Sequence, residues 1–219
     1  TIVLIPIFTF FLLLLKGKFR IFFEQVSDGD GVVLKVVQSI SLLSRKWLKG
    51  VLTVMLVLSV LNSVGFLLLG LKYAILLGVT AAILNEIPYI GPWVGALMPI
   101  TIALLTKDSA MYAVGAAGVI LITQFIDNNF VTPKVVGSSV SINPLASIVA
   151  LLAGGMLWGV VGLILAIPIT GMLKLVFDEI PAMRPWGFLL GEEKTWPKES
   201  LLQMPFGMWK PSARPPRRP

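Results

Sequence analysis

The sequence predicts an all-α protein, a polytopic bundle of transmembrane helices in which some helices are broken or re-entrant. Two observations support this prediction. Hydrophobic residues make up 56% of the 219 residues and charged residues only 13%, whereas an ordinary soluble domain has about 25% charged residues. The apolar residues are also gathered in long uncharged runs, and several of these runs are interrupted by Gly and Pro.

The chain contains no cysteine and no histidine. Their absence excludes disulfides, thiol nucleophiles, Ser-His-Asp triads and nearly every zinc site. We therefore expect no cofactor, no metal centre and no enzymatic activity. The net charge is +7, and the basic residues flank the apolar runs. This pattern indicates membrane orientation and contact with the lipid bilayer rather than nucleic-acid binding.

The first segment, residues 1–15, is one apolar run that we interpret as the end of a transmembrane helix. Because Thr1 leads directly into this run without an initiator Met, we expect the chain to be the C-terminal piece of a longer protein. Residues 16–49 follow, with seven basic and three acidic residues and apolar residues at helical spacing. They predict a cytoplasmic amphipathic helical segment, split near Gly29–Gly31, on the membrane surface or against a partner subunit.

Residues 50–177 should form a transmembrane transport core. Val51–Leu71 is an uncharged run of spanning length, and Asn62 at its centre serves either a helix–helix hydrogen bond or a polar pathway. Residues 73–105 form two short apolar runs around a polar, Pro- and Gly-containing break at 85–93. Such a pair is typical of a broken or re-entrant helix, whose irregular backbone must be buried in protein or line a cavity.

A second broken segment is predicted over residues 145–177. A straight helix of this length would run about 50 Å, well beyond the hydrocarbon core of about 30 Å. An irregular stretch over residues 130–143 precedes it, and the remaining 178–219 should be a cytoplasmic Pro-rich tail. The residues expected to act as structural breaks are Pro133, Gly137, Gly155, Gly159, Gly162 and Pro168.

Two topologies place residues 16–49 and the tail on the same, cytoplasmic side. In one, the segments 51–71, 73–105, 110–126 and 145–177 each cross the membrane. In the other, 73–105 and 145–177 are hairpins that return to their own side. The sequence does not distinguish these topologies.

Three motifs carry a family resemblance. The octapeptide from Asn85 to Pro92 resembles the IPYIGP signature of the autoinducer-2 exporter (AI-2E) family. Gln124-x-x-Asp127-Asn128, with Pro133 and Gly137 downstream, is similar to that family's second signature. Leu152–Pro168 is similar to its Gly-rich final helix.

The resemblance implies a multi-pass protein of the bacterial inner membrane that assembles as a homo-oligomer. It also implies gradient-driven transport of small polar solutes, such as the quorum-sensing molecule autoinducer-2. Other members of the family are linked to Na⁺(Li⁺)/H⁺ exchange, so Na⁺ or H⁺ is a further expected partner. Glu86 departs from the resemblance, because an apolar residue is expected at its position.

The candidate substrate or ion path is drawn from the two helix breaks. Between residues 50 and 173 the acidic residues are Glu86, Asp108 and Asp127, and acids inside a membrane normally face a cavity or a partner. For each of these residues a simpler role is also open. The acids can lie at the level of the headgroups, and the Pro and Gly residues can only break a helix. The tyrosine can lie at the membrane interface, and the amides can cap a helix end. A channel or structural membrane component also remains open. The residues assigned to the path are Glu86, Pro88, Tyr89, Gly91, Pro92, Gln124, Asp127, Asn128 and Asn62.

Overall fold

The computed structural model describes residues 4–26, 31–135 and 142–192. These residues are helical and include no sheet, so the predicted all-α class is confirmed. The helices of the first half are α1 (Leu4–Leu14), α2 (Lys16–Val26), α3 (Val32–Leu68), α4 (Ala74–Asn85), α5 (Gly91–Thr106) and α6 (Met111–Ile126). A π-helical turn η1 (Asp127–Val131), α7 (Thr132–Val135), α8 (Pro144–Glu179), a 3₁₀ turn η2 (Pro181–Met183) and α9 (Arg184–Leu190) follow.

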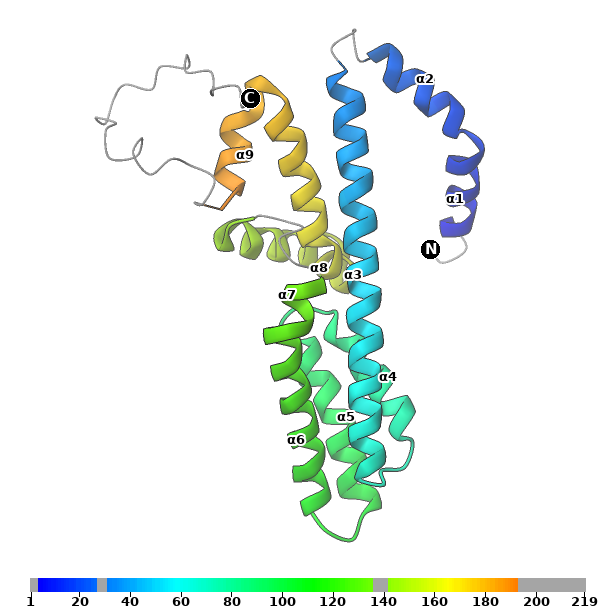
Figure 1. The fold of residues 1–219 in the computed structure, drawn as a ribbon, viewed down its shortest axis with the longest axis vertical. Coiled ribbons are helices and arrows are strands. Elements are labelled where there is room, and N and C mark those ends of the chain that lie inside the picture. The colour runs from blue at the N-terminus through cyan, green and yellow to red at the C-terminus, as the bar shows by residue number, and fades with distance from the viewer. Residues whose placement is uncertain (1–3, 27–30, 136–141, 193–219) are drawn as a thin grey trace, which may run out of the picture.

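Helix α3 is the axis of the molecule (Figure 1). It has 37 residues and is therefore about 55 Å long. Helices α4 and α6 pack against its C-terminal half, α5 packs on α4 and α6, and the last part of α8 lies beside its N-terminal half. Gly50 is helical and buried and no proline interrupts the helix, so α3 runs through the position where we expect the cytoplasmic segment to meet the transport core. The amphipathic stretch from Val32 therefore continues directly into the apolar span.

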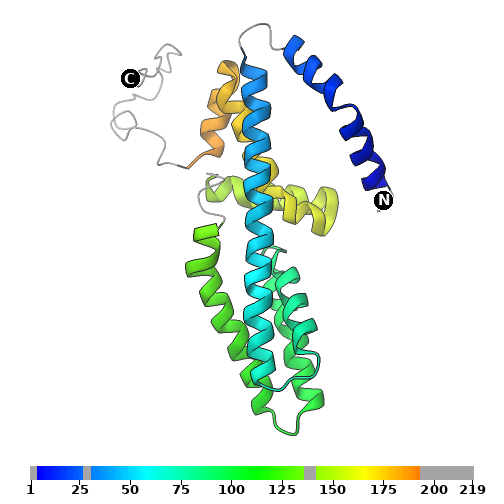
Figure 2. The same cartoon turned by 45° about the vertical axis from the view of Figure 1, so that its right-hand side comes forward.

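Three helical stretches in the described ranges are long and apolar enough to cross a membrane: Val32–Leu68, Met111–Val135 and Pro144–Glu179. Helices α4 and α5 are shorter and form a hairpin. The turn before α4 and the turn after α5 lie at the same end of the bundle (Figure 2). Residues 73–105 therefore adopt the hairpin arrangement of the two topologies considered above.

The main core joins α3, α4, α5 and α6 near this end. Its large residue is Phe66, which is fully buried, and most of its other members are small. Alanine side chains let apolar helices approach closely where burial gives little hydrophobic driving force in lipid. The buried members of this core are Phe66, Leu71, Ala74, Leu77, Ala103, Ala113 and Ala116.

Helix α8 changes direction at Gly159, which has φ 60° and ψ −135°. A residue with a side chain rarely adopts this conformation. On either side of the turn, Gly154 and Gly162 touch, since a Cβ on either would overlap the carbonyl group of the other. The prediction that Gly155, Gly162 and Pro168 are also breaks is wrong, because all three have helical backbone. Pro168 is buried inside the helix, whose single sharp turn at Gly159 already shortens the segment.

The irregular stretch expected from residue 130 is also corrected. The chain remains helical to Val135, first as a π turn and then as α7, which has Pro133 at its second position. A proline is tolerated in the first turn of a helix, so Pro133 does not break it. Gly137 and the predicted tail after residue 192 lie outside the described residues. Residues 181–190, at the start of the segment predicted to be the cytoplasmic tail, form η2 and α9 and pack on α8.

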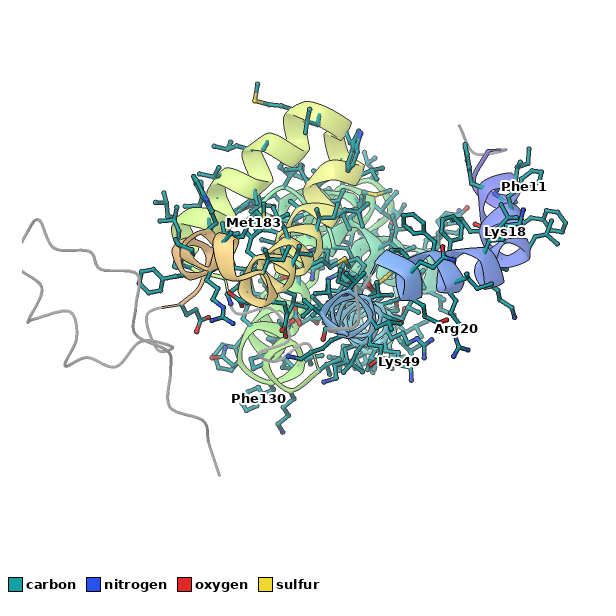
Figure 3. The ribbon with its side chains drawn as sticks, turned by 90° about the horizontal axis from the view of Figure 1, so that it is seen from above. Phe11, Lys18, Arg20, Lys49, Phe130 and Met183 are labelled. Carbon is teal, nitrogen blue, oxygen red and sulfur yellow. The ribbon has the colours of Figure 1, made fainter. Side chains whose placement is uncertain are left out.

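Helices α1 and α2 lie to one side of the bundle, as the view from above shows (Figure 3). Helix α2 contacts the start of α3, and α1 contacts α2. The side chains of α1 from Pro6 onward are exposed, including Phe8 and Phe10. An exposed apolar helix of this kind is suited to lipid or to further protein.

Candidate functional site

The tip of the α4–α5 hairpin is a tight, strained turn. Tyr89 has φ 65°, an uncommon conformation for a residue with a side chain. The N–H of Ile90 donates to the carbonyl of Pro88 at 2.8 Å, which closes a three-residue turn around Tyr89. A Cβ on Gly91 would overlap the Leu84 carbonyl. The start of α5 can therefore lie directly against the end of α4 only with glycine at this position.

Asp127 faces this tip from the end of α6. Its side chain is 4% exposed, and it is the first residue of the π turn. The Nδ2 atom of Asn85 donates to Oδ2 of Asp127 at 3.2 Å, and Oγ1 of Thr132 donates to Oδ1 at 2.7 Å. A buried carboxylate requires such donors. The bond from Asn85 ties the hairpin tip to the π turn, and the bond from Thr132 holds the carboxylate within that turn.

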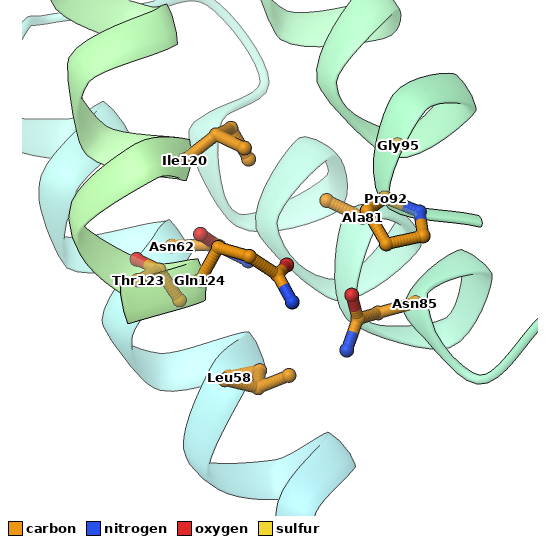
Figure 4. Close-up of a pocket in the computed structure, with 9 residues that line it drawn as sticks. All are labelled: Leu58, Asn62, Ala81, Asn85, Pro92, Gly95, Ile120, Thr123 and Gln124. Atoms are coloured by element: carbon orange, nitrogen blue, oxygen red, sulfur yellow. The ribbon is translucent and has the colours of Figure 1, made fainter. Parts of the chain in front are cut away.

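A small cavity lies beside this contact, between α3, α4, α5 and α6 (Figure 4). Its volume is about 10 Å³, close to the space that one water molecule needs. The amide groups of Asn85 and Gln124 face each other across it, and Asn62 lies behind Gln124. The lining residues are Leu58, Asn62, Ala81, Asn85, Pro92, Gly95, Ile120, Thr123 and Gln124.

The residues predicted for the path are divided by the structure. Asn62, Pro92 and Gln124 line the cavity, and Asp127 is joined to it through Asn85. Gly91 is buried in the hairpin packing.

The other four predicted residues are not among those that line the cavity. Glu86 and Pro88 are half-buried in the tip. Tyr89 is 72% exposed. Asn128 is also exposed, and its Oδ1 atom accepts a hydrogen bond from Nε2 of Gln124 at 3.4 Å.

Two polar lining residues were not assigned to the path from the sequence. Asn85 begins the octapeptide of the first signature, so its position next to Glu86 was a usable signal. Thr123 had no signal, because one threonine in an apolar helix most often bonds its own backbone. The described residues contain no group of three or more His, Cys, Asp or Glu suited to a metal ion. The polar groups of the site are thus amides, hydroxyls and one buried carboxylate, which can bind a polar solute or a small cation.

Comparison with known proteins supports the family resemblance that the motifs at the two helix breaks indicate. The model of the AI-2E family of transporters matches residues 1–182. The chain belongs to the AI-2E transporter family. It is accordingly a membrane protein of a transporter family.

Individual relatives extend over most of this chain. YrrI of Bacillus subtilis (strain 168), named provisionally as a transport protein, is 38% identical over 138 residues, which is 63% of this chain and 38% of YrrI. PerM of Escherichia coli (strain K12), named provisionally as a permease, is 30% identical over 181 residues, 82% of this chain and 51% of PerM. The AI-2 transport protein TqsA of the same strain is 25% identical over 179 residues, 81% of this chain and 50% of TqsA. The chain thus spans about two fifths to one half of the length of these relatives.

Proposed function

We propose that this chain supplies the transport pathway of a gradient-driven transporter, an exporter of small polar solutes such as autoinducer-2-like molecules. The observation that carries the proposal is the buried contact between the hairpin tip and Asp127. Interrupted apolar helices whose ends meet around polar groups are the usual form of a substrate site in secondary transporters. Burying a carboxylate in an apolar bundle also costs free energy, and for that reason such residues are rare and usually mark a functional site.

The cavity suggests how such a pathway opens and closes. With a volume of about 10 Å³, it accommodates about one water molecule and no larger solute. A solute could pass here only if the hairpin tip moves away from α6. In this proposal the Asn85–Asp127 hydrogen bond closes the path, and movement of the strained turn at Tyr89 opens it.

A second candidate function is Na⁺(Li⁺)/H⁺ exchange. It is favoured by the burial of Asp127. In an exchanger the same carboxylate binds a proton and a cation in turn, and it must do so out of contact with bulk water. A passive pore is the third candidate, and it requires no coupling residue.

We further propose that the protein lies in the bacterial inner membrane as a homo-oligomer. The first half of α8 is suited to lipid or to a second copy of the chain, because its side chains near the Gly159 turn are apolar and exposed, including Met156, Leu157 and Trp158. Cross-linking of the protein in native membranes, followed by mass measurement in nanodiscs, tests this. A single-copy mass in both would contradict it.

The central experiment is flux by the full-length protein in proteoliposomes. Autoinducer-2, Na⁺ and pH gradients are varied separately. Saturable solute movement that follows an ion or proton gradient is expected. Cation–proton exchange without solute movement would support the antiporter instead, and unsaturable conductance would support a pore.

A further inference from the structure

A second, larger pocket lies between the middle of α3 and the end of α7. Its volume is about 270 Å³, far more than one water molecule needs. Val135 of α7 packs against a small core that includes Val54 of α3, so the two helices are in contact at this place. The lining residues are Lys46, Lys49, Gly50, Thr53 and Val135.

The pocket carries two positive charges that no acidic side chain in the described ranges balances. Lys35, nearer the start of α3, forms an ion pair with Glu179, with 2.8 Å between its Nζ atom and a carboxylate oxygen. Lys46 and Lys49 take part in none of the ion pairs found among the described residues, and no residue that lines the pocket is acidic. The Thr53 hydroxyl already donates to the Lys49 carbonyl at 2.8 Å. The two ammonium groups are therefore the donors of the pocket, and they suit an anion with several acceptor oxygens, such as a phosphate group.

An exposed apolar strip continues from the pocket along the same face of α3. Residues three or four positions apart are neighbours on a helix surface, which places the two lysines and Thr53 in line with Leu56 and Val60. Leu56 is 67% exposed and Val60 is 55% exposed, and both belong to a helix that is apolar enough to cross a membrane. The lysines lie directly before the uncharged run of this helix, where a spanning helix meets the lipid headgroups. A ligand with a phosphate group and acyl chains matches both the pocket and the strip.

We propose that Lys46 and Lys49 bind the phosphate group of an anionic phospholipid of the cytoplasmic leaflet, with an acyl chain along Leu56 and Val60. Membrane orientation alone calls for basic residues at this end of the helix. It does not require that they share one face with a pocket and an apolar strip. Basic pockets between helices on the cytoplasmic side are typical sites for anionic headgroups. The lipid would lie against both α3 and α7, and its binding does not depend on which solute the protein transports.

Native mass spectrometry of the purified full-length protein tests the site. The protein is titrated in detergent with phosphatidylglycerol or with phosphatidylcholine of the same acyl chains. We expect phosphatidylglycerol to bind more tightly, because the choline ammonium group of the other lipid is repelled by the lysines. In Lys46→Gln/Lys49→Gln, the binding of phosphatidylglycerol should weaken by about 30-fold, and the binding of phosphatidylcholine should change little.

The control variant is Lys16→Gln/Lys18→Gln. It removes the same charge from exposed positions of α2, outside the pocket, and should bind phosphatidylglycerol as the wild type does. Lys46→Arg/Lys49→Arg keeps both charges and should also retain binding. If the double glutamine variant does not fold, Lys49→Gln alone serves, with an expected loss of about fivefold.

Three results would overturn the proposal. Equal binding of the two lipids by the wild type would show that the pocket does not select an anionic headgroup. Equal losses in the pocket variant and the α2 variant would show attraction by net charge only. Inorganic phosphate and glycerol 1-phosphate, which have no acyl chains, are added as competitors. If either displaces phosphatidylglycerol at a concentration comparable to that of the lipid, the pocket is a site for free phosphate and not for a lipid.

Discussion

Asn85 at the end of α4 donates a hydrogen bond to Asp127 at the end of α6, with 3.2 Å between Nδ2 and Oδ2. The two residues are separated by 42 positions in the sequence, and each belongs to a different one of the two motifs that resemble the family's signatures. The contact therefore joins the two motifs in space. It fixes the hairpin tip against the π turn at the one buried carboxylate of the described bundle.

The first prediction concerns the strength of this contact. A double-mutant cycle of Asn85→Ala and Asp127→Ala should give a coupling energy of about 1.5–3 kcal/mol, the range for hydrogen bonds to charged groups. Chemical denaturation in detergent measures it. The control cycle pairs Asp127→Ala with Thr106→Ala, at the far end of α5, which should be additive within about 0.5 kcal/mol. Additivity in both cycles would show that the Asn85–Asp127 bond is not formed.

A second prediction concerns the charge of Asp127. Asp127→Asn keeps the size of the side chain and can still accept from Thr132, and the Asn85 amide can turn its oxygen toward the new amino group, so assembly should be unchanged. Gradient-driven flux in proteoliposomes should be lost, because the carboxylate is removed from the path. Asn129→Ala, a change at an exposed residue on the same turn, should keep wild-type flux. Wild-type flux in Asp127→Asn would reduce Asp127 to a structural helix-end residue.

The third prediction tests the packing of the hairpin tip. Gly91→Ala should destabilise the protein by about 1–3 kcal/mol, because its Cβ would meet backbone that cannot move aside cheaply. Gly118→Ala in α6 is the matched control, since a Cβ there has nothing within 4 Å. Alanine at this helical position should be neutral or stabilise by up to about 1 kcal/mol. Equal Tm values for the two variants would argue against the close approach of α4 and α5.

The fourth prediction tests the topology. Because α4 and α5 form a hairpin, the turn before α4, which contains Lys72, and the turn after α5, which contains Ser109, lie at the same end of the bundle (Figure 2). The chain has no cysteine, so Lys72→Cys and Ser109→Cys each introduce a single thiol. An impermeant maleimide applied outside intact cells should label both, and Ser41→Cys on the cytoplasmic side should be labelled only after permeabilisation. Labelling of Lys72→Cys and Ser109→Cys from opposite sides would show a single broken span.

The sequence by itself determined the class of the protein and the presence of interrupted helices. Composition and uncharged runs are sufficient for this, because a membrane accepts only backbones that satisfy their own hydrogen bonds. The octapeptide from Asn85 to Pro92 likewise predicted the break between α4 and α5, since Pro and Gly act on the local backbone wherever they occur. Among several candidate breaks in the last span, however, the sequence did not single out Gly159.

Only the tertiary structure decided which residues meet. Whether residues 73–105 turn back or continue across depends on packing against α3 and α6, which local backbone preferences do not contain. The same packing brought Asn85 and Thr123 to the cavity and left Tyr89 exposed, although Tyr89 lies within the more conspicuous motif.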